Sequence, residues 1–144
     1  MTTDARTTRP GRRWLLAGAI LMLITATLHT AGQFGPTPPG LESALSTMQQ
    51  SKLEMGFGMA PSLFDIFRDL TFTMSVTFYA LGLFNLLVAL SADVTVPLQR
   101  RIALLNVGWI AVFIALCAYY QVPPPLICGI VMWPVFVMAH VRSK

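Results

Sequence analysis

Four long apolar stretches, separated by polar and proline-containing segments, dominate the pattern of the chain. They run from about Trp14 to Ala31, Leu70 to Leu90, Ile102 to Tyr120 and Leu126 to Val141. A bilayer core of about 30 Å requires roughly 20 apolar residues in helical form, and a helix satisfies its backbone groups within the segment. The pattern therefore predicts an all-α membrane protein, in which residues 14–144 form a four-transmembrane-helix bundle.

The segment between the first two spans, residues 32–69, changes character along its length. It opens with three prolines within residues 36–39, which cannot continue a helix and favour an extended chain. Apolar residues at near-helical spacing among polar ones then predict an amphipathic helix over residues 41–55, ended by Gly56. Such a helix suits the outer membrane surface, either as a lid over the bundle or as a partner-binding element.

The amino-acid composition also indicates a protein embedded in lipid. The chain of 144 residues is 55% hydrophobic and 11% charged, with a mean hydropathy of +0.65, whereas soluble domains carry about 25% charged residues. The net charge of +4 could suggest nucleic acid, but the basic residues gather at helix ends and form no stripe interleaved with aromatic residues. The distribution therefore predicts membrane topology and argues against a nucleic-acid partner.

Basic residues are divided unevenly between the two sides of the predicted bundle. Two of the ten, Lys52 and Arg68, lie on one side together with four acidic residues. The other eight lie on the side that holds both termini: Arg6, Arg9, Arg12, Arg13, Arg100, Arg101, Arg142 and Lys144. The positive-inside rule then predicts cytoplasmic termini, with residues 1–13 as a basic tail and the first and third loops facing outward.

His29 is an ionisable residue within the first predicted span. It lies on the same helical face as Met22 and Ala26, about 22 Å along the axis from Trp14 at 1.5 Å per residue. This places it in the outer part of the membrane, pointing into the bundle. A histidine at that depth is either a functional group or a neutral imidazole that hydrogen-bonds a neighbour, and the sequence leaves both readings open.

Four further polar residues lie near the same outer end. Gln33 follows His29 by one turn, Arg68 ends the small and polar face of the second long helix, and Asp65 can pair with it. Gln121 comes from the short third loop. These five residues define a candidate ligand-binding site, although Asp65 also lies where a helix N-terminus favours negative charge.

Two further pairs of residues lie at matching depths in neighbouring spans. Asn85 and Asn106 are at similar distances from the inner ends of the second and third spans, which predicts a hydrogen-bonded pair with a structural role. Cys117 and Cys128 flank the outer hairpin between the third and fourth spans. They could form a disulfide on an oxidising side or remain two apolar thiols.

The other residues predict neither a metal site nor a cofactor. Two cysteines without a CxxC pattern or a histidine cluster carry no zinc or redox signature. The only two histidines, His29 and His140, are predicted near opposite membrane faces and cannot both ligate one haem. No phosphate-binding loop, nucleophile elbow or metalloprotease helix is present.

Several short motifs are spread over most of the chain after residue 14. They are His29, the proline-rich outer loop, Ser62-Leu63-Phe64-Asp65-Ile66-Phe67-Arg68, Gly82, Asn85, Leu105-Asn106 and Pro123-Pro124-Pro125. Through them the chain resembles an uncharacterised bacterial family of small four-span integral membrane proteins. The family often has a glycine after the arginine, where this chain has Asp69. The resemblance implies a multi-pass protein of the bacterial inner (cytoplasmic) membrane. It implies no particular activity.

The sequence favours a non-catalytic role. Well-formed packing faces without a complete catalytic set indicate an accessory subunit of a membrane complex, or a small homo-oligomer, embedded in the lipid bilayer. The alternative is a membrane enzyme or a binder of an apolar ligand, such as a quinone, a lipid or a sterol-like molecule. In that case His29 would donate a proton or anchor the ligand, with Asp65 and Arg68 orienting it.

The charge distribution generates a topology prediction. A label that cannot cross the membrane is expected to react with the N-terminal tail only from the cytoplasmic side. The reason is that the side of a bundle with more basic residues, here eight of ten, stays in the cytoplasm. Labelling of residues 32–69 from the opposite side is the matched control. Reaction of the tail from the exterior would contradict the arrangement.

Overall fold

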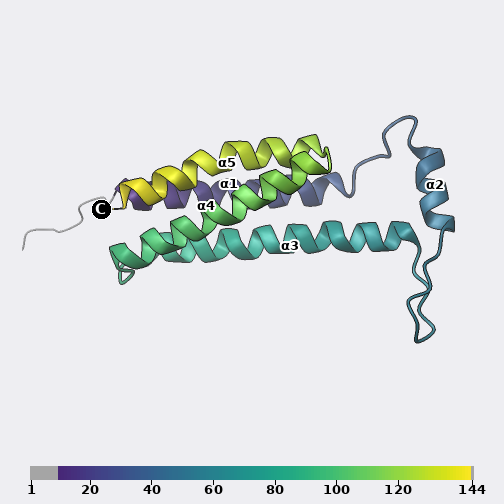
Figure 1. Ribbon diagram of the computed structural model, residues 1–144, viewed down its shortest axis with the longest axis horizontal. Coiled ribbons are helices and arrows are strands. Elements are labelled where there is room, and N and C mark those ends of the chain that lie inside the picture. The colour runs from purple at the N-terminus through teal and green to yellow at the C-terminus, as the bar shows by residue number, and fades with distance from the viewer. Residues whose placement is uncertain (1–9, 144) are drawn as a thin grey trace, which may run out of the picture. The chain divides into compact units, whose positions relative to one another are not determined.

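The computed structural model describes residues 10–143, and its regular elements are five helices (Figure 1). In chain order they are α1 (Pro10–Gly32), α2 (Glu42–Gln50), α3 (Leu63–Leu90), α4 (Val96–Tyr119) and α5 (Pro123–Arg142). By length and composition, α1, α3, α4 and α5 can each cross a membrane. The predicted fold class is therefore confirmed: four long apolar helices with one short helix, α2, between the first two. The predicted basic tail falls largely on residues 1–9, which lie outside the described residues.

Two helix boundaries differ from those expected. Within the described residues, α1 extends from Pro10, ahead of the apolar stretch, so that Arg12 and Arg13 lie on the helix. α2 ends at Gln50, whereas the sequence predicts a helix over residues 41–55. The backbone after Gln50 forms hydrogen bonds with another segment, in which the N–H of Leu53 donates to the carbonyl of Pro61 at 3.0 Å. Pairing with the chain that returns to α3 thus replaces the last helical turn.

The chain divides into two compact units. The first, here called the four-helix unit, contains α1 up to Thr25, α3 from Tyr79, and the whole of α4 and α5. The second, the loop unit, is Ala26–Phe78 and contains the end of α1, the whole of α2 and the first half of α3.

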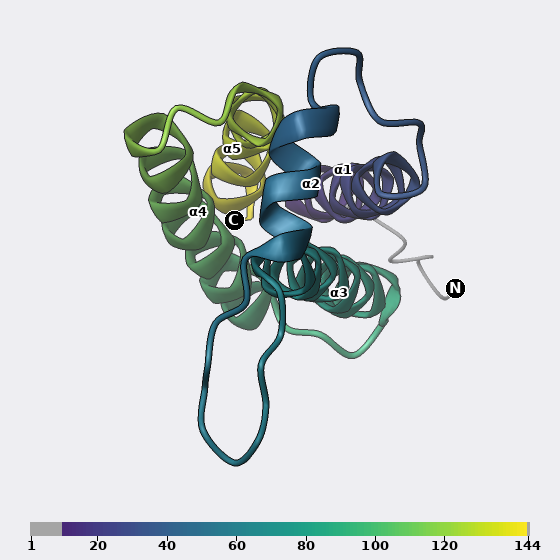
Figure 2. The same ribbon diagram turned by 90° about the vertical axis from the view of Figure 1, so that its right-hand side faces the viewer.

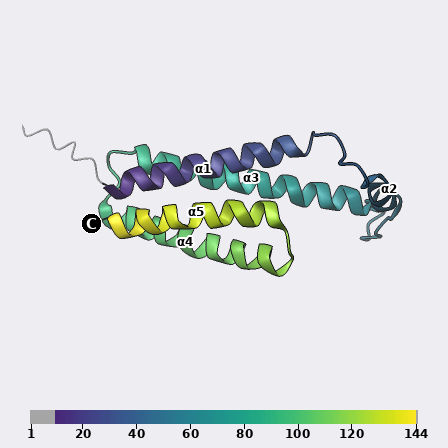
Figure 3. The ribbon, with the colours of Figure 1, turned by 90° about the horizontal axis from the view of Figure 1, so that it is seen from above.

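In the four-helix unit, α4 and α5 form an antiparallel helical hairpin and lie side by side (Figure 3). Gly129 of α5 permits their close approach, because a Cβ there would lie 2.8 Å from Cγ1 of Ile114 and 3.2 Å from Phe113. α4 ends where Gln121 adopts a left-handed backbone with φ 55°. α5 then begins with prolines, whose missing N–H groups are tolerated in a first turn.

The ring of four helices is closed by α1, which packs on both α3 and α5 (Figure 2). A Cβ at Gly82 of α3 would lie 2.9 Å from Leu23 of α1, and a Cβ at Gly18 of α1 would lie 2.5 Å from the ring of Phe136 on α5. At both glycines, a neighbouring side chain therefore fills the space that a side chain of their own would occupy. Small residues at such contacts let membrane helices approach closely, which is the main source of packing energy in lipid.

The first and the last described residues lie at the same end of the four-helix unit. The Arg12 guanidinium donates to the carbonyls of Ala89 and, at 2.8 Å, of Leu90, so the start of α1 caps the end of α3. The Gln99 amide donates to the hydroxyl of Ser143 at 3.3 Å, which joins the start of α4 to the end of α5. This end carries Arg12, Arg13, Arg100, Arg101 and Arg142.

Candidate functional site

His29 lies in the last turn of α1, within the loop unit. Its ring lies near the backbone of Thr71 on α3. Its Nε2 atom is buried and has no hydrogen-bond partner among the residues that the structure describes. The Nε2 atom is therefore available to bond a further group.

An aromatic contact lies beside Gln33 and Arg68. Phe34, next to Gln33 at the end of α1, lies 6.0 Å from Phe72 of α3 between ring centroids, with a tilt of 56°. The Arg68 guanidinium lies 5.8 Å from the centroid of the Phe72 ring, within the range of a cation–π contact. The structure therefore places Arg68 against an aromatic ring that the sequence analysis did not single out. The signal was available, because residues four apart face each other on a helix.

Asp65 closes the N-terminus of α3. Its carboxylate accepts the N–H of Ser62 at 3.1 Å and the hydroxyl of Ser62 at 2.7 Å, while that hydroxyl accepts the N–H of Asp65 at 3.1 Å. This is the reciprocal arrangement of a capping box. It explains Asp65 as a structural residue that starts the helix at Leu63.

The remaining candidates belong to the four-helix unit. Gln121 is exposed and supplies the left-handed residue of the turn between α4 and α5. His29, Gln33, Asp65 and Arg68 all belong to the loop unit, so the structure brings only these four into one compact unit.

The two cysteines are free thiols. Cys117 is buried on α4 and Cys128 is half-buried on α5. Within residues 10–143, no three histidine, cysteine, aspartate or glutamate side chains gather in a way that could hold a metal ion.

Asn85 and Asn106 form the central polar contact of the four-helix unit. Each side-chain amide donates to the carbonyl oxygen of the other, at 3.0 and 2.9 Å. The second hydrogen of Asn106 bonds the carbonyl of Ile102 at 2.8 Å, and Asn85 also donates to the sulfur of Met22 at 3.5 Å. Both side chains are buried, and all four of their amide hydrogens have acceptors. The pair therefore ties α3 to α4 and reaches α1.

A hairpin between α2 and α3, residues 51–63, is a feature that the sequence analysis missed. Isolated bridges join Lys52 to Ser62 and Gly56 to Met59. The N–H of Met59 bonds the carbonyl of Gly56 at 3.0 Å across Phe57 and Gly58, whose φ angles are 54° and 76°. Positive φ at both central residues is the pattern of a type I′ turn, the usual tip of a tight hairpin. The paired glycines around Phe57 were its signal in the sequence.

The helices and the polar contacts between them define the class of the molecule: a small multi-pass membrane protein with four spans. Comparison of the chain with known protein families, with characterised proteins and with solved structures finds no match.

The asparagine pair yields a stability prediction. Asn85→Leu or Asn106→Leu alone is expected to lower the free energy of unfolding by about 1–2 kcal/mol, because the partner amide is left buried without its bond. The double replacement should cost less than the sum of the two, since both polar groups are removed together. Unfolding in mixed detergent and dodecyl sulfate micelles, followed by circular dichroism, measures these differences.

The matched control is Leu87→Ala, an exposed position on the same helix as Asn85, which is expected to change stability by less than about 0.5 kcal/mol. Strictly additive effects of the two asparagine replacements would contradict a direct contribution of the pair.

Proposed function

We propose that the protein is a non-catalytic accessory subunit that contacts another membrane protein through the hairpin of residues 51–63. The observation that carries the proposal is the apolar tip of this hairpin. Phe57 is fully exposed, and Met55 and Met59 on either side of it are each 57% exposed. Exposed clusters of large apolar side chains mark interaction sites. Methionine and aromatic residues are also enriched where proteins meet.

The backbone at the tip supports the same reading. Phe57 has a left-handed φ of 54°, and a bulky residue in that region costs of order 1–3 kcal/mol. Glycine or asparagine would fill this turn position with less strain. The Phe57 ring therefore lowers the stability of the turn but lies where a partner can reach it.

The direction of the hairpin favours a neighbour in the same membrane. Within the loop unit, the hairpin runs across the axis of the first half of α3 (Figure 1). A segment that extends sideways from the start of a membrane-spanning helix reaches over the bilayer surface. A laterally adjacent membrane protein, or a second copy of the chain, is then the natural contact.

The proposal includes the orientation in the membrane. The end that carries Arg12, Arg13, Arg100, Arg101 and Arg142 would face the cytoplasm, and the hairpin would face outward. Resemblance to the bacterial four-span family supports assignment to the bacterial inner membrane.

The hairpin can be tested with a replacement that preserves its turn. Phe57→Asn keeps a residue suited to the left-handed position and removes the ring. It is expected to leave thermal stability equal or slightly higher and to weaken assembly by about 2 kcal/mol, roughly 30-fold, as for a central interface residue. The measurement is the mass of the particle purified from its native membrane in a mild detergent, relative to the 15.8 kDa chain.

Leu41→Asn is the matched control, because Leu41 is an exposed apolar residue of the same loop unit and lies outside the hairpin. It should leave the particle mass unchanged. A wild-type particle that is strictly monomeric and partner-free, or a mass that does not respond to Phe57→Asn, counts against the proposal.

A second candidate function, the binding of an apolar ligand, is favoured by the unpartnered Nε2 atom of His29. An unsatisfied polar atom in a low-dielectric setting is costly unless a ligand or water completes its bonding. A quinone, lipid or sterol-like molecule with a single polar group would meet that need. Phe34 and Phe72 would supply apolar contact nearby.

His29→Ala tests this second function. If His29 anchors a ligand, the variant should lose any co-purified apolar molecule detected by mass spectrometry of an organic extract, and its fold should be retained. His140→Ala is the matched control, since His140 bonds the carbonyl of Arg100 at 3.0 Å through Nδ1 and lies in the other unit. A change in thermal stability alone, with no change in the extract, would rule the ligand role out.

A further inference from the structure

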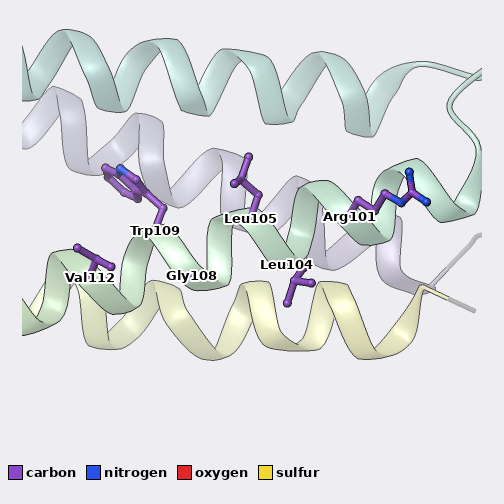
Figure 4. A pocket seen from close by; sticks show the side chains of 6 residues that line it. All are labelled: Arg101, Leu104, Leu105, Gly108, Trp109 and Val112. Carbon is purple, nitrogen blue, oxygen red and sulfur yellow. The ribbon is translucent and has the colours of Figure 1, made fainter.

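α4 carries an apolar groove on its exposed surface. The groove is shallow and open, with a volume of about 580 Å³. Its lining comes from α4 alone: Arg101, Leu104, Leu105, Gly108, Trp109 and Val112 (Figure 4). The groove therefore runs along one helix of the four-helix unit.

Gly108 forms the floor of the groove. A Cβ at this position would meet nothing within 4 Å, unlike those at Gly18, Gly82 and Gly129. Trp109 provides a wall and is stacked on Phe113, with ring centroids 5.6 Å apart and the planes within 6° of parallel. The missing side chain thus leaves open space beside a flat aromatic surface, in a helix whose exposed positions face lipid.

Charge is found at one end of the groove only. Arg101 lies at the arginine-rich end of the four-helix unit, and the other lining residues are apolar. Asp93, in the turn before α4, is the acidic residue nearest in the chain. The groove therefore presents a cation at the membrane surface and apolar side chains at greater depth.

The length of the groove distinguishes between two candidate occupants, a helix of a second copy and a phospholipid. From Arg101 to Val112 the helix rises by about 16 Å at 1.5 Å per residue, close to the thickness of one leaflet, about half of a 30 Å core. A helix from a second copy would be expected to follow α4 over the whole span. A phospholipid has a charged head at the surface and a chain confined to one leaflet, which matches this groove in both charge and length.

We propose that this groove binds one anionic phospholipid, with its phosphate at Arg101 and an acyl chain lying over Gly108 against Trp109. The lipid belongs to the leaflet at the arginine-rich end. Polar contact with the headgroup gives selectivity for negative charge, and the chain contributes apolar burial.

The experiment uses the full chain in nanodiscs that contain phosphatidylglycerol and phosphatidylcholine in equal amounts. After gentle release, native mass spectrometry records the lipids that remain bound. Wild-type protein is expected to retain phosphatidylglycerol in preference. Arg101→Gln should reduce this preference about fivefold, the loss expected for one basic residue at an anionic surface. Arg100→Gln is the matched control, because Arg100 carries the same charge and does not line the groove.

Gly108→Leu tests the chain position. The added side chain enters open space, so folding should be retained while binding of both lipids falls. Ala111→Leu, an exposed α4 position outside the lining, is its control. In a Trp14→Phe, Trp133→Phe background, which leaves one of the three tryptophans, brominated phosphatidylglycerol should quench Trp109 in the Ala111→Leu protein more than in the Gly108→Leu protein.

Equal lipid preference in Arg101→Gln and Arg100→Gln would overturn the proposal. A shift from dimer to monomer in Gly108→Leu, with phosphatidylglycerol preference unchanged, would also overturn it and assign the groove to a second copy.

Discussion

The structure depends on the requirement that polar groups placed inside a membrane bond to one another. Helices meet this requirement for the backbone. For side chains it is met by Asn85 and Asn106, whose two reciprocal hydrogen bonds of 3.0 and 2.9 Å join α3 to α4. Lipid offers these amides no alternative partner, so the pair sets the rotation of both helices. Once those faces are turned inward, the remaining apolar positions of the same helices are left to face lipid.

Glycine has two different uses within this arrangement. At Gly18, Gly82 and Gly129 the space of the missing side chain is occupied by a neighbour from another helix, and the helices pack closely. At Gly108 the space stays open on the exposed face of α4. The same residue type thus allows close helix packing at three positions and leaves space for a groove at Gly108, where Arg101 lies at one end.

The segment between α1 and α3 follows different rules, because it lies outside the four apolar helices and water can complete the bonds of its backbone. Its hairpin is closed by a few backbone hydrogen bonds and presents Met55, Phe57 and Met59 outward, not into a core. Next to it, the capping box of Ser62 and Asp65 starts α3. Asp65 is therefore accounted for by local geometry, whereas Phe57 has no structural use that explains its strained backbone.

The sequence by itself determined the four spans and the presence of a short helix between the first two, because these follow from apolar length and helical periodicity. It also placed Asn85 and Asn106 at matching depth. The contact of Arg68 with Phe72 and the hairpin of residues 51–63 had local signals in the sequence, namely the four-residue spacing and the paired glycines. Only the tertiary structure decided that neighbouring side chains fill the space beside Gly18, Gly82 and Gly129, whereas the space beside Gly108 stays open. These outcomes depend on which faces meet across segments distant in the chain, and helical periodicity predicts a face without specifying its partner.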